Sequence, residues 1–96
     1  MPILTTLEKV KSYIGIKVST AKDDEITDLI AEAKKDIKTS GVDLIFIVET
    51  DVLIMRAIKF YCLANYDKND PRSGPCEKAY SALVIHLALS GDYHVV

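Results

Sequence analysis

Apolar residues recur at intervals of three and four along most of this chain, a spacing that places them on one side of an α-helix. The pattern is widest in residues 50–66, TDVLIMRAIKFYCLANY, where apolar side chains cover roughly 200° of the circumference and only Arg56 and Lys59 mark a polar side. One seam of this segment contains Leu53, Ala57, Phe60 and Ala64. We therefore expect a central helix with neighbours on most sides.

This apolar segment does not have the pattern of a membrane span. A span needs about 20 mostly apolar residues. The segment is interrupted by Asp51, Arg56, Lys59 and Asn65. The sequence predicts a core helix and no contact with a membrane.

Three further helices are predicted, near residues 5–14, 23–39 and 76–89. The first has Thr5 at its N-cap, and Gly15 ends it in a left-handed conformation. The second begins with three carboxylates, which the helix dipole favours, and stops before glycine 41. These start and stop signals indicate helices joined by short loops.

The predicted last helix, at 76–89, is apolar on two opposite sides. One side contains Tyr80, Leu83, Val84 and Leu87. The other side contains Ala82, Ile85 and Leu89. One side can pack on the central helix, but a chain of 96 residues has little left to cover the other. We expect that second side to meet another protein.

Residues 42–49, VDLIFIVE, are open to three interpretations from the pattern alone: a short strand, an extended connector or an early helical turn. A lone strand would have no partner elsewhere in the chain, so we interpret the segment as an apolar connector pressed onto the core. The segment after Tyr66, DKNDPRSGP, is typical of an exposed loop. The predicted fold is a single all-α domain, 1–96, built as a small bundle of four helices. Its expected centre contains Leu29, Ile30, Ala33, Leu53, Ala57, Phe60, Ala64, Leu83 and Leu87.

The composition and net charge are typical of a single soluble domain and argue against a nucleic-acid-binding protein. The chain is 49% apolar and 27% charged, with a formal net charge of −2, which describes one domain with an ordinary soluble surface. A nucleic-acid-binding protein would normally carry a basic excess on one face. Two cysteines are too few for a disulfide scaffold and no signal-peptide pattern is present, so we expect synthesis in a reducing cytoplasm.

No motif in the sequence predicts catalysis, a metal or an organic cofactor. The carboxylates at 23–25 lack the alternating pattern of a calcium loop, and the glycine motifs of nucleotide-binding proteins and serine hydrolases are absent. The remaining metal-ligating residues match none of the paired spacings of zinc sites. They are Cys62, Cys76, His86 and His94. We expect a protein that is not an enzyme and needs no cofactor.

Tyrosines give a better indication of function, because tyrosine combines a large contact area with a polar tip and is favoured at protein interfaces. Tyrosines at the margin of the core would explain the same residues equally well. We combine two of them with the second apolar side of the last helix as a candidate subunit interface. It contains Tyr61, Tyr66, Ala82, Ile85, His86 and Leu89.

Four stretches of the sequence together resemble a known family. They are TLEKVKSYIGI at 6–16, DDEITDLIAEAKKDIKTSGV at 23–42, LIMRAIKFYCLANYD at 53–67 and AYSALVIHLALSGDYH at 79–94, of which LALSGDY is the most specific. The pattern is similar to the small all-helical head–tail connector, or adaptor, proteins of long-tailed bacteriophages. The apolar run LIFIV at 44–48 departs from it, because a more polar connector is expected there.

The resemblance implies a structural role at the head–tail junction of a virion assembled in the cytoplasm of a host bacterium. Copies would form a ring homo-oligomer under the portal protein, next to a tail-side head-completion protein, with a channel through which DNA passes. Since the two apolar sides of the last helix differ, the simplest contact between copies is heterologous, and such contacts close into rings when the rotation permits. The resemblance supplies no catalytic residues.

Two other functions stay open on the sequence. One is a small cytoplasmic helical adaptor or regulator that docks a single protein partner through the central helix. The other is a helical nucleic-acid-binding protein, whose affinity would fall steeply with salt and which the net charge disfavours.

Overall fold

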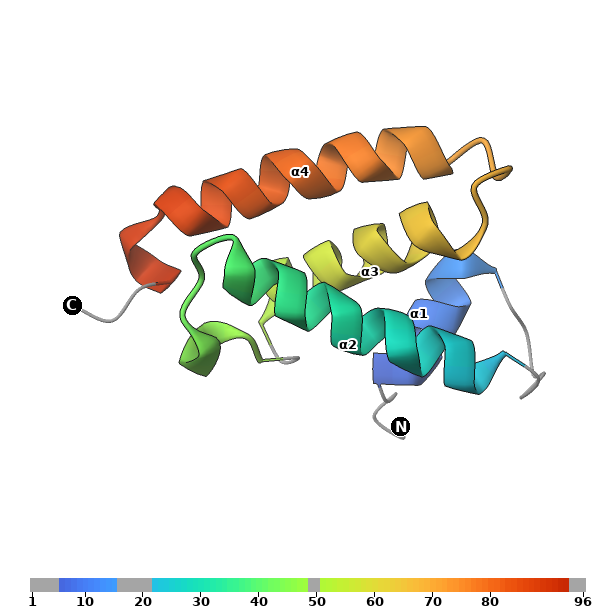
Figure 1. Ribbon diagram of the computed structural model, residues 1–96, viewed down its shortest axis with the longest axis horizontal. Coiled ribbons are helices and arrows are strands. Elements are labelled where there is room, and N and C mark those ends of the chain that lie inside the picture. Colours follow the sequence, from blue (N-terminus) through green and yellow to red (C-terminus); the bar gives the residue numbers. More distant parts are fainter. Residues whose placement is uncertain (1–5, 16–21, 49–50, 94–96) are drawn as a thin grey trace.

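The apolar periodicity of the sequence becomes four α-helices and two short 3-10 helices within residues 6–15, 22–48 and 51–93, the parts that the computed structural model describes (Figure 1). The α-helices are α1 (Thr6–Ile14), α2 (Asp23–Thr39), α3 (Val52–Tyr66) and α4 (Ser73–Leu89). The 3-10 helices are η1 (Leu44–Phe46) and η2 (Gly91–Tyr93). No strand occurs in these ranges, and the predicted all-α bundle is confirmed.

Helix α3 is the centre of the bundle, as its wide apolar arc predicts. It packs against α1, α2 and α4, and α4 runs antiparallel to it after a tight loop (Figure 1). The buried side chains of α3 are Ile54, Met55, Ala57, Ile58, Cys62, Leu63 and Ala64. They point in several directions around the helix, because three neighbouring helices cover it.

The predicted centre of the core needs one correction. Its buried members are Ile30, Ala33, Ala57, Ala64 and Leu87, in agreement with the sequence pattern. Leu29, Leu53, Phe60 and Leu83 are only partly buried and pack against the core from its edge. The seam that we predicted through Leu53 and Phe60 therefore lies beside the most buried line of α3, which passes through Ile54, Ile58 and Cys62.

The helix ends follow local chemistry. Gly15 and Gly41 have positive φ angles of 98° and 118°, which confirms their predicted roles as helix stops. At the start of α3, the Asp51 carboxylate accepts the backbone N–H groups of Leu53 at 2.9 Å and Ile54 at 3.2 Å. The predicted cap at Thr5 and the first predicted residue of the central helix, Thr50, lie outside the described residues.

Helix α4 begins three residues earlier than the sequence predicts, at Ser73 instead of Cys76. The prolines and glycine that we assigned to the loop include Pro75, which is accepted in a first helical turn because the N–H that proline lacks has no partner there. The buried Ser73 hydroxyl donates to the Ala64 carbonyl at 2.8 Å. This bond fixes the beginning of α4 against the last turn of α3.

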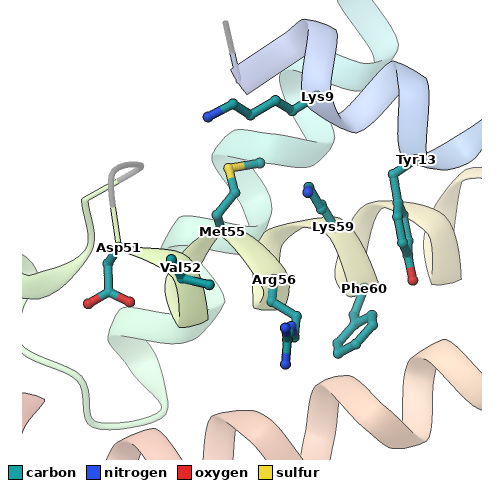
Figure 2. Close-up of a pocket in the computed structure, with 8 residues that line it drawn as sticks. All are labelled: Lys9, Tyr13, Asp51, Val52, Met55, Arg56, Lys59 and Phe60. Atoms are coloured by element: carbon teal, nitrogen blue, oxygen red, sulfur yellow. The ribbon is translucent and has the colours of Figure 1, made fainter. Parts of the chain in front are cut away.

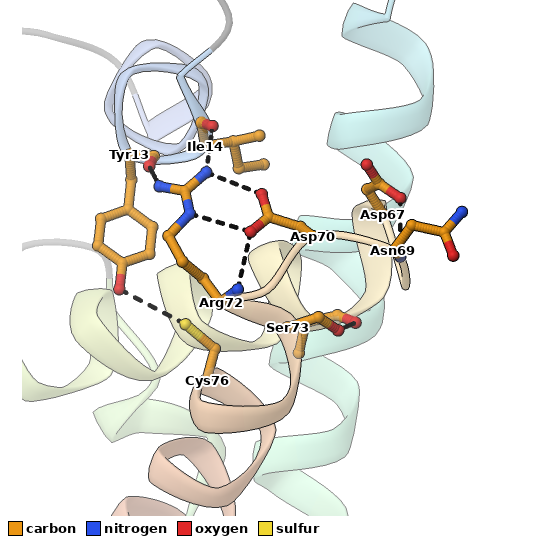
Figure 3. A network of polar contacts seen from close by, with 9 residues as sticks. Tyr13, Ile14, Asp67, Asn69, Asp70, Arg72, Ser73 and Cys76 are labelled. Atoms are coloured by element: carbon orange, nitrogen blue, oxygen red, sulfur yellow. Dashed lines mark hydrogen bonds and ion pairs between the residues drawn. The ribbon is translucent and has the colours of Figure 1, made fainter.

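Arg72 joins the α3–α4 loop to α1 (Figure 3). Its guanidinium donates from Nη2 to the Ile14 carbonyl at 2.9 Å and from Nη1 to the Tyr13 carbonyl at 3.4 Å, two acceptors that the end of α1 leaves free. The Asp70 carboxylate holds the same guanidinium at 2.9 Å and 3.2 Å, and this pairing lowers the pKa of Asp70. The loop therefore closes the end of the bundle at which α1 terminates.

The connector before α3 is only partly pressed onto the core. Phe46 and Ile47 pack there as expected, whereas Ile45 is 66% exposed and Val48 is 45% exposed. The backbone forms a single 3-10 turn, η1, which is the helical alternative among the three that the sequence left open. A short turn cannot bury every member of an apolar run, because successive side chains point to different sides.

Candidate functional site

Four of the predicted interface residues lie together on the outer side of α4. Ala82, Ile85, His86 and Leu89 are all exposed, and the exposed fractions of Ile85 and Leu89 are 60% and 82%. The opposite side of α4 carries Tyr80, Val84 and Leu87, which are buried. The two apolar sides that the sequence predicted for this helix therefore have different environments.

The two predicted interface tyrosines are placed elsewhere. Tyr61 is half-buried, and its ring packs edge-on against Tyr80 with 5.2 Å between ring centroids. Tyr66 is the last residue of α3, at the end of the bundle opposite Leu89 (Figure 1). The structure thus does not bring Tyr61 and Tyr66 together with the exposed side of α4.

Three further large apolar residues that the prediction omitted are exposed: Ile45, Val48 and Val52. Val52, the first residue of α3, is 71% exposed; Ile45 belongs to η1, and Val48 follows η1. In Figure 1 this part of the chain lies at the same end of the bundle as the last turn of α4. We call this surface the apolar end; it contains Ile45, Val48, Val52, Ile85 and Leu89.

Contacts through Tyr93 hold the parts of the apolar end together. The Tyr93 ring packs edge-on against Phe46, with centroids 6.1 Å apart, and its carbonyl accepts the Asp43 N–H at 3.1 Å. Its hydroxyl donates to the Asp51 carboxylate at the start of α3. Nearby, a Cβ placed on Gly41 would lie 3.6 Å from the Ala88 Cβ, so α2 ends against α4 there. The exposed apolar residues are therefore carried by a packed scaffold.

The apolar run at 44–48 was the sequence signal that could have identified this surface. Successive side chains of a single turn point to different sides, so some members of such a run had to be exposed. The sequence could not show which ones, because that depends on where Tyr93 returns to contact Phe46.

A second surface feature is a groove of about 360 Å³ between α1 and α3 (Figure 2). Its cationic lining consists of Lys9, Arg56 and Lys59. Its remaining lining consists of Tyr13, Asp51, Val52, Met55 and Phe60. Val52 belongs to both surfaces, so the groove opens beside the apolar end.

Aromatic contacts form the wall of the groove near the end of α1. The ring of Tyr13 lies edge-on to that of Phe60, with centroids 6.3 Å apart, and the Lys59 ammonium lies 6.0 Å from the Tyr13 centroid. Burial, and then a hydrogen bond with Cys76, raise the pKa of the Tyr13 hydroxyl, which therefore stays neutral. Asp51, the one acidic residue of the lining, is already engaged as the cap of α3. The groove consequently has a cationic and apolar character suited to an acidic partner.

The cysteines and histidines do not form a reactive or metal-binding centre in the described part of the chain. Cys62 is fully buried, and burial raises the pKa of its thiol to about 12, the reverse of an activated nucleophile. His86 is exposed on α4, and His94 lies outside the described residues. Among residues 6–15, 22–48 and 51–93, no group of three or more His, Cys, Asp or Glu side chains could hold a metal ion.

Comparison with protein-family models, with curated proteins and with solved structures finds no match to this chain. No helix within the described ranges has the length and apolar character that crossing a membrane would require.

Proposed function

We propose that this protein is a structural head–tail connector of a tailed phage or prophage, which assembles as a ring under the portal protein and joins capsid to tail. The observation that carries the proposal is the apolar end, where five large hydrophobic side chains are exposed on one packed scaffold. The resemblance of the sequence to connector proteins supports the same role.

The apolar end is more apolar than the surface of an isolated small domain needs to be. Its most exposed members, Leu89, Val52 and Ile45, leave 82%, 71% and 66% of their surfaces accessible. Covering a large apolar side chain contributes about 1.5–3 kcal/mol, so covering several of them offsets a large part of the cost of association. A group of exposed large apolar residues at one end of a domain is typical of a protein-interaction site.

An alternative function is supported by the groove between α1 and α3. A small adaptor that docks one protein partner would need a single concave site beside an apolar surface, and Val52 joins the groove to the apolar end in this way. The two functions differ in where the protein is found. A connector remains in the finished virion, whereas an adaptor or regulator is absent from it.

The experiment is deletion of the gene in the phage or prophage that carries it. Because a connector joins two separately built structures, we expect the deletion to yield DNA-containing heads and free tails that do not join, visible by electron microscopy. We also expect the protein in several copies in purified wild-type virions, counted by quantitative mass spectrometry. Normal yields of infectious particles after deletion, or virions that lack the protein, would refute the connector function.

Complementation tests the apolar end itself. A plasmid copy with Ile85→Glu and Leu89→Glu should not restore joining, because two carboxylates would be desolvated at the contact. The matched control is Asn69→Glu, which adds a carboxylate to an exposed residue of the α3–α4 loop at the opposite end of the bundle and should restore joining fully (Figure 1). Circular dichroism of each variant establishes that it is folded.

A further inference from the structure

The groove between α1 and α3 gathers three cations that have no acidic partner within the described residues. Lys9 reaches it from α1, and Arg56 and Lys59 project from α3 (Figure 2). The ion pairs described elsewhere use other cations: Lys11 with Asp23, Lys22 with Glu25, and Arg72 with Asp70. Like charges that line one groove without a counterion repel one another, and a ligand that carries negative charge would remove this cost.

Helix α2 carries the opposite imbalance. Asp24, Asp28 and Glu32 follow one another at intervals of four residues, all are exposed, and none forms an ion pair with a described cation. We call these three residues the acidic ridge. Like charges at this spacing destabilise an isolated helix by about 0.2–0.5 kcal/mol per pair, and a cationic partner would remove that cost.

Glu32 of the acidic ridge and the groove lie on opposite sides of α3, which α2 contacts. Burial first, and then the charge of Glu32, raise the pKa of the Tyr61 hydroxyl, because Glu32 lies near Tyr61. Tyr61 follows Val52 by nine positions, which is about 180° around a helix, and Val52 lines the groove.

From this arrangement we infer that the groove of one copy of the protein receives the acidic ridge of a second copy. We choose a second copy as the occupant because the chain carries both charges: cations in the groove, and carboxylates on the exposed acidic ridge that a neighbouring copy can present. A groove on one side and its ligand on the opposite side make a heterologous contact, which can repeat from copy to copy. The inference rests on the proposed connector function, for which it names the contact between neighbouring subunits.

The spacing of the cations along α3 matches the spacing of the carboxylates along α2. Arg56 and Lys59 are separated by about one helical turn, as are Asp28 and Glu32, so two helices can align two pairs at once. Lys9 adds a third cation to the groove, as Asp24 adds a third carboxylate to the ridge. The rings of Tyr13 and Phe60 add apolar surface to one wall of the groove.

The test is a charge exchange measured on the purified, full-length chain by sedimentation equilibrium at low salt. We expect the native chain to self-associate at submillimolar to millimolar concentration, and less so as salt is raised. The groove variant R56E/K59E and the ridge variant D28K/E32K should each weaken self-association about tenfold or more. An equimolar mixture of the two variants should associate again, because each then offers the charge that the other lacks, and one chain with all four substitutions should also associate.

A control variant separates this contact from a general effect of charge. K68E/K78E makes the same change in net charge as R56E/K59E, at two exposed lysines outside both surfaces, and should leave self-association unchanged.

A native chain that stays monomeric at millimolar concentration and low salt would overturn the inference. A mixture of the two variants that associates no more than its components would also overturn it. If the mixture associates but gene deletion leaves virions intact, the contact stands and the connector function fails. If deletion separates heads from tails but the exchange has no effect, the connector function stands and this contact fails.

Discussion

The Tyr93 hydroxyl donates to both carboxylate oxygens of Asp51, at 3.1 Å and 3.0 Å. The same carboxylate caps α3 by accepting the N–H groups of Leu53 and Ile54. One side chain therefore fixes both the beginning of the central helix and the return of the chain after α4. Because the apolar end is assembled from these two regions, its shape depends on this pair.

The first prediction concerns the stability that this pair supplies. Asp51→Ala removes the cap and leaves the Tyr93 hydroxyl without its acceptor, so we expect the free energy of unfolding to fall by about 1–3 kcal/mol. Tyr93→Phe keeps the cap and should cost about 1 kcal/mol. Urea denaturation measures both, with the exposed Asp92→Ala as control. A loss below about 0.5 kcal/mol for Asp51→Ala would contradict this account of the cap.

A second prediction compares two glycines. Gly41 has a φ angle of 118°, which a side chain resists, so Gly41→Ala should lower the free energy of unfolding by about 1–2 kcal/mol. The added Cβ would meet Ala88 at 3.6 Å, an ordinary contact, so the cost comes from the backbone alone. Gly74 lies in the first turn of α4 with open space around it, and Gly74→Ala should be neutral or stabilising by up to about 1 kcal/mol. Equal effects at the two positions would be inconsistent with this explanation.

The third prediction tests the link between α3 and α4. The Ser73 hydroxyl is buried and donates to the Ala64 carbonyl, which lies in the last turn of α3. Ser73→Ala leaves this carbonyl without its partner and should cost about 1–3 kcal/mol in the free energy of unfolding. Ser81→Ala, on the exposed side of the same helix, is the matched control and should change stability by less than about 0.5 kcal/mol. If thermal denaturation does not distinguish the two variants, the hydrogen bond between Ser73 and Ala64 does not contribute measurably to stability.

The sequence predicted the helices well because each has local signals that act without tertiary context. The glycines at 15 and 41 end their helices, and the carboxyl of Asp51 begins another. Where the prediction of a helix start was wrong, the deciding contact joins two different helices. The start of α4 is fixed at Ser73 by a carbonyl nine residues earlier, which the pattern of apolar positions does not show.

The candidate surfaces were predictable to different degrees. Ile85 and Leu89 could be identified as exposed because a helix has two sides and one neighbour covers only one of them. Tyr61 could not be separated from the core by type alone, since its position against Tyr80 depends on how α3 and α4 pack. The groove joins Lys9 and Tyr13 of α1 to residues 51–60, far later in the chain, so no local pattern could predict it.

The last prediction is a loss of stability at alkaline pH. Burial raises the pKa of the Cys62 thiol to about 12, and burial followed by the hydrogen bond to Asp36 raises the pKa of the Tyr80 hydroxyl. In the unfolded chain these groups titrate near pH 8.5 and about pH 10. Above those values the unfolded chain loses protons that the folded chain keeps. The free energy of unfolding should therefore be constant with respect to these groups at neutral pH and fall as pH rises, by up to about 1.4 kcal/mol per pH unit for each group.

Urea denaturation from about pH 7 to about pH 11 measures this dependence. Cys62→Ala and Tyr80→Phe should each lower stability at neutral pH, because one leaves a small cavity and the other removes a hydrogen bond. Both should nevertheless make the alkaline decline shallower than in the native chain, since each removes one group whose pKa folding raises. The exposed Ser81→Ala variant should decline as steeply as the native chain. An unchanged slope in both buried-site variants would mean that other groups cause the alkaline loss, and that Cys62 and Tyr80 do not hold their protons through burial in the bundle.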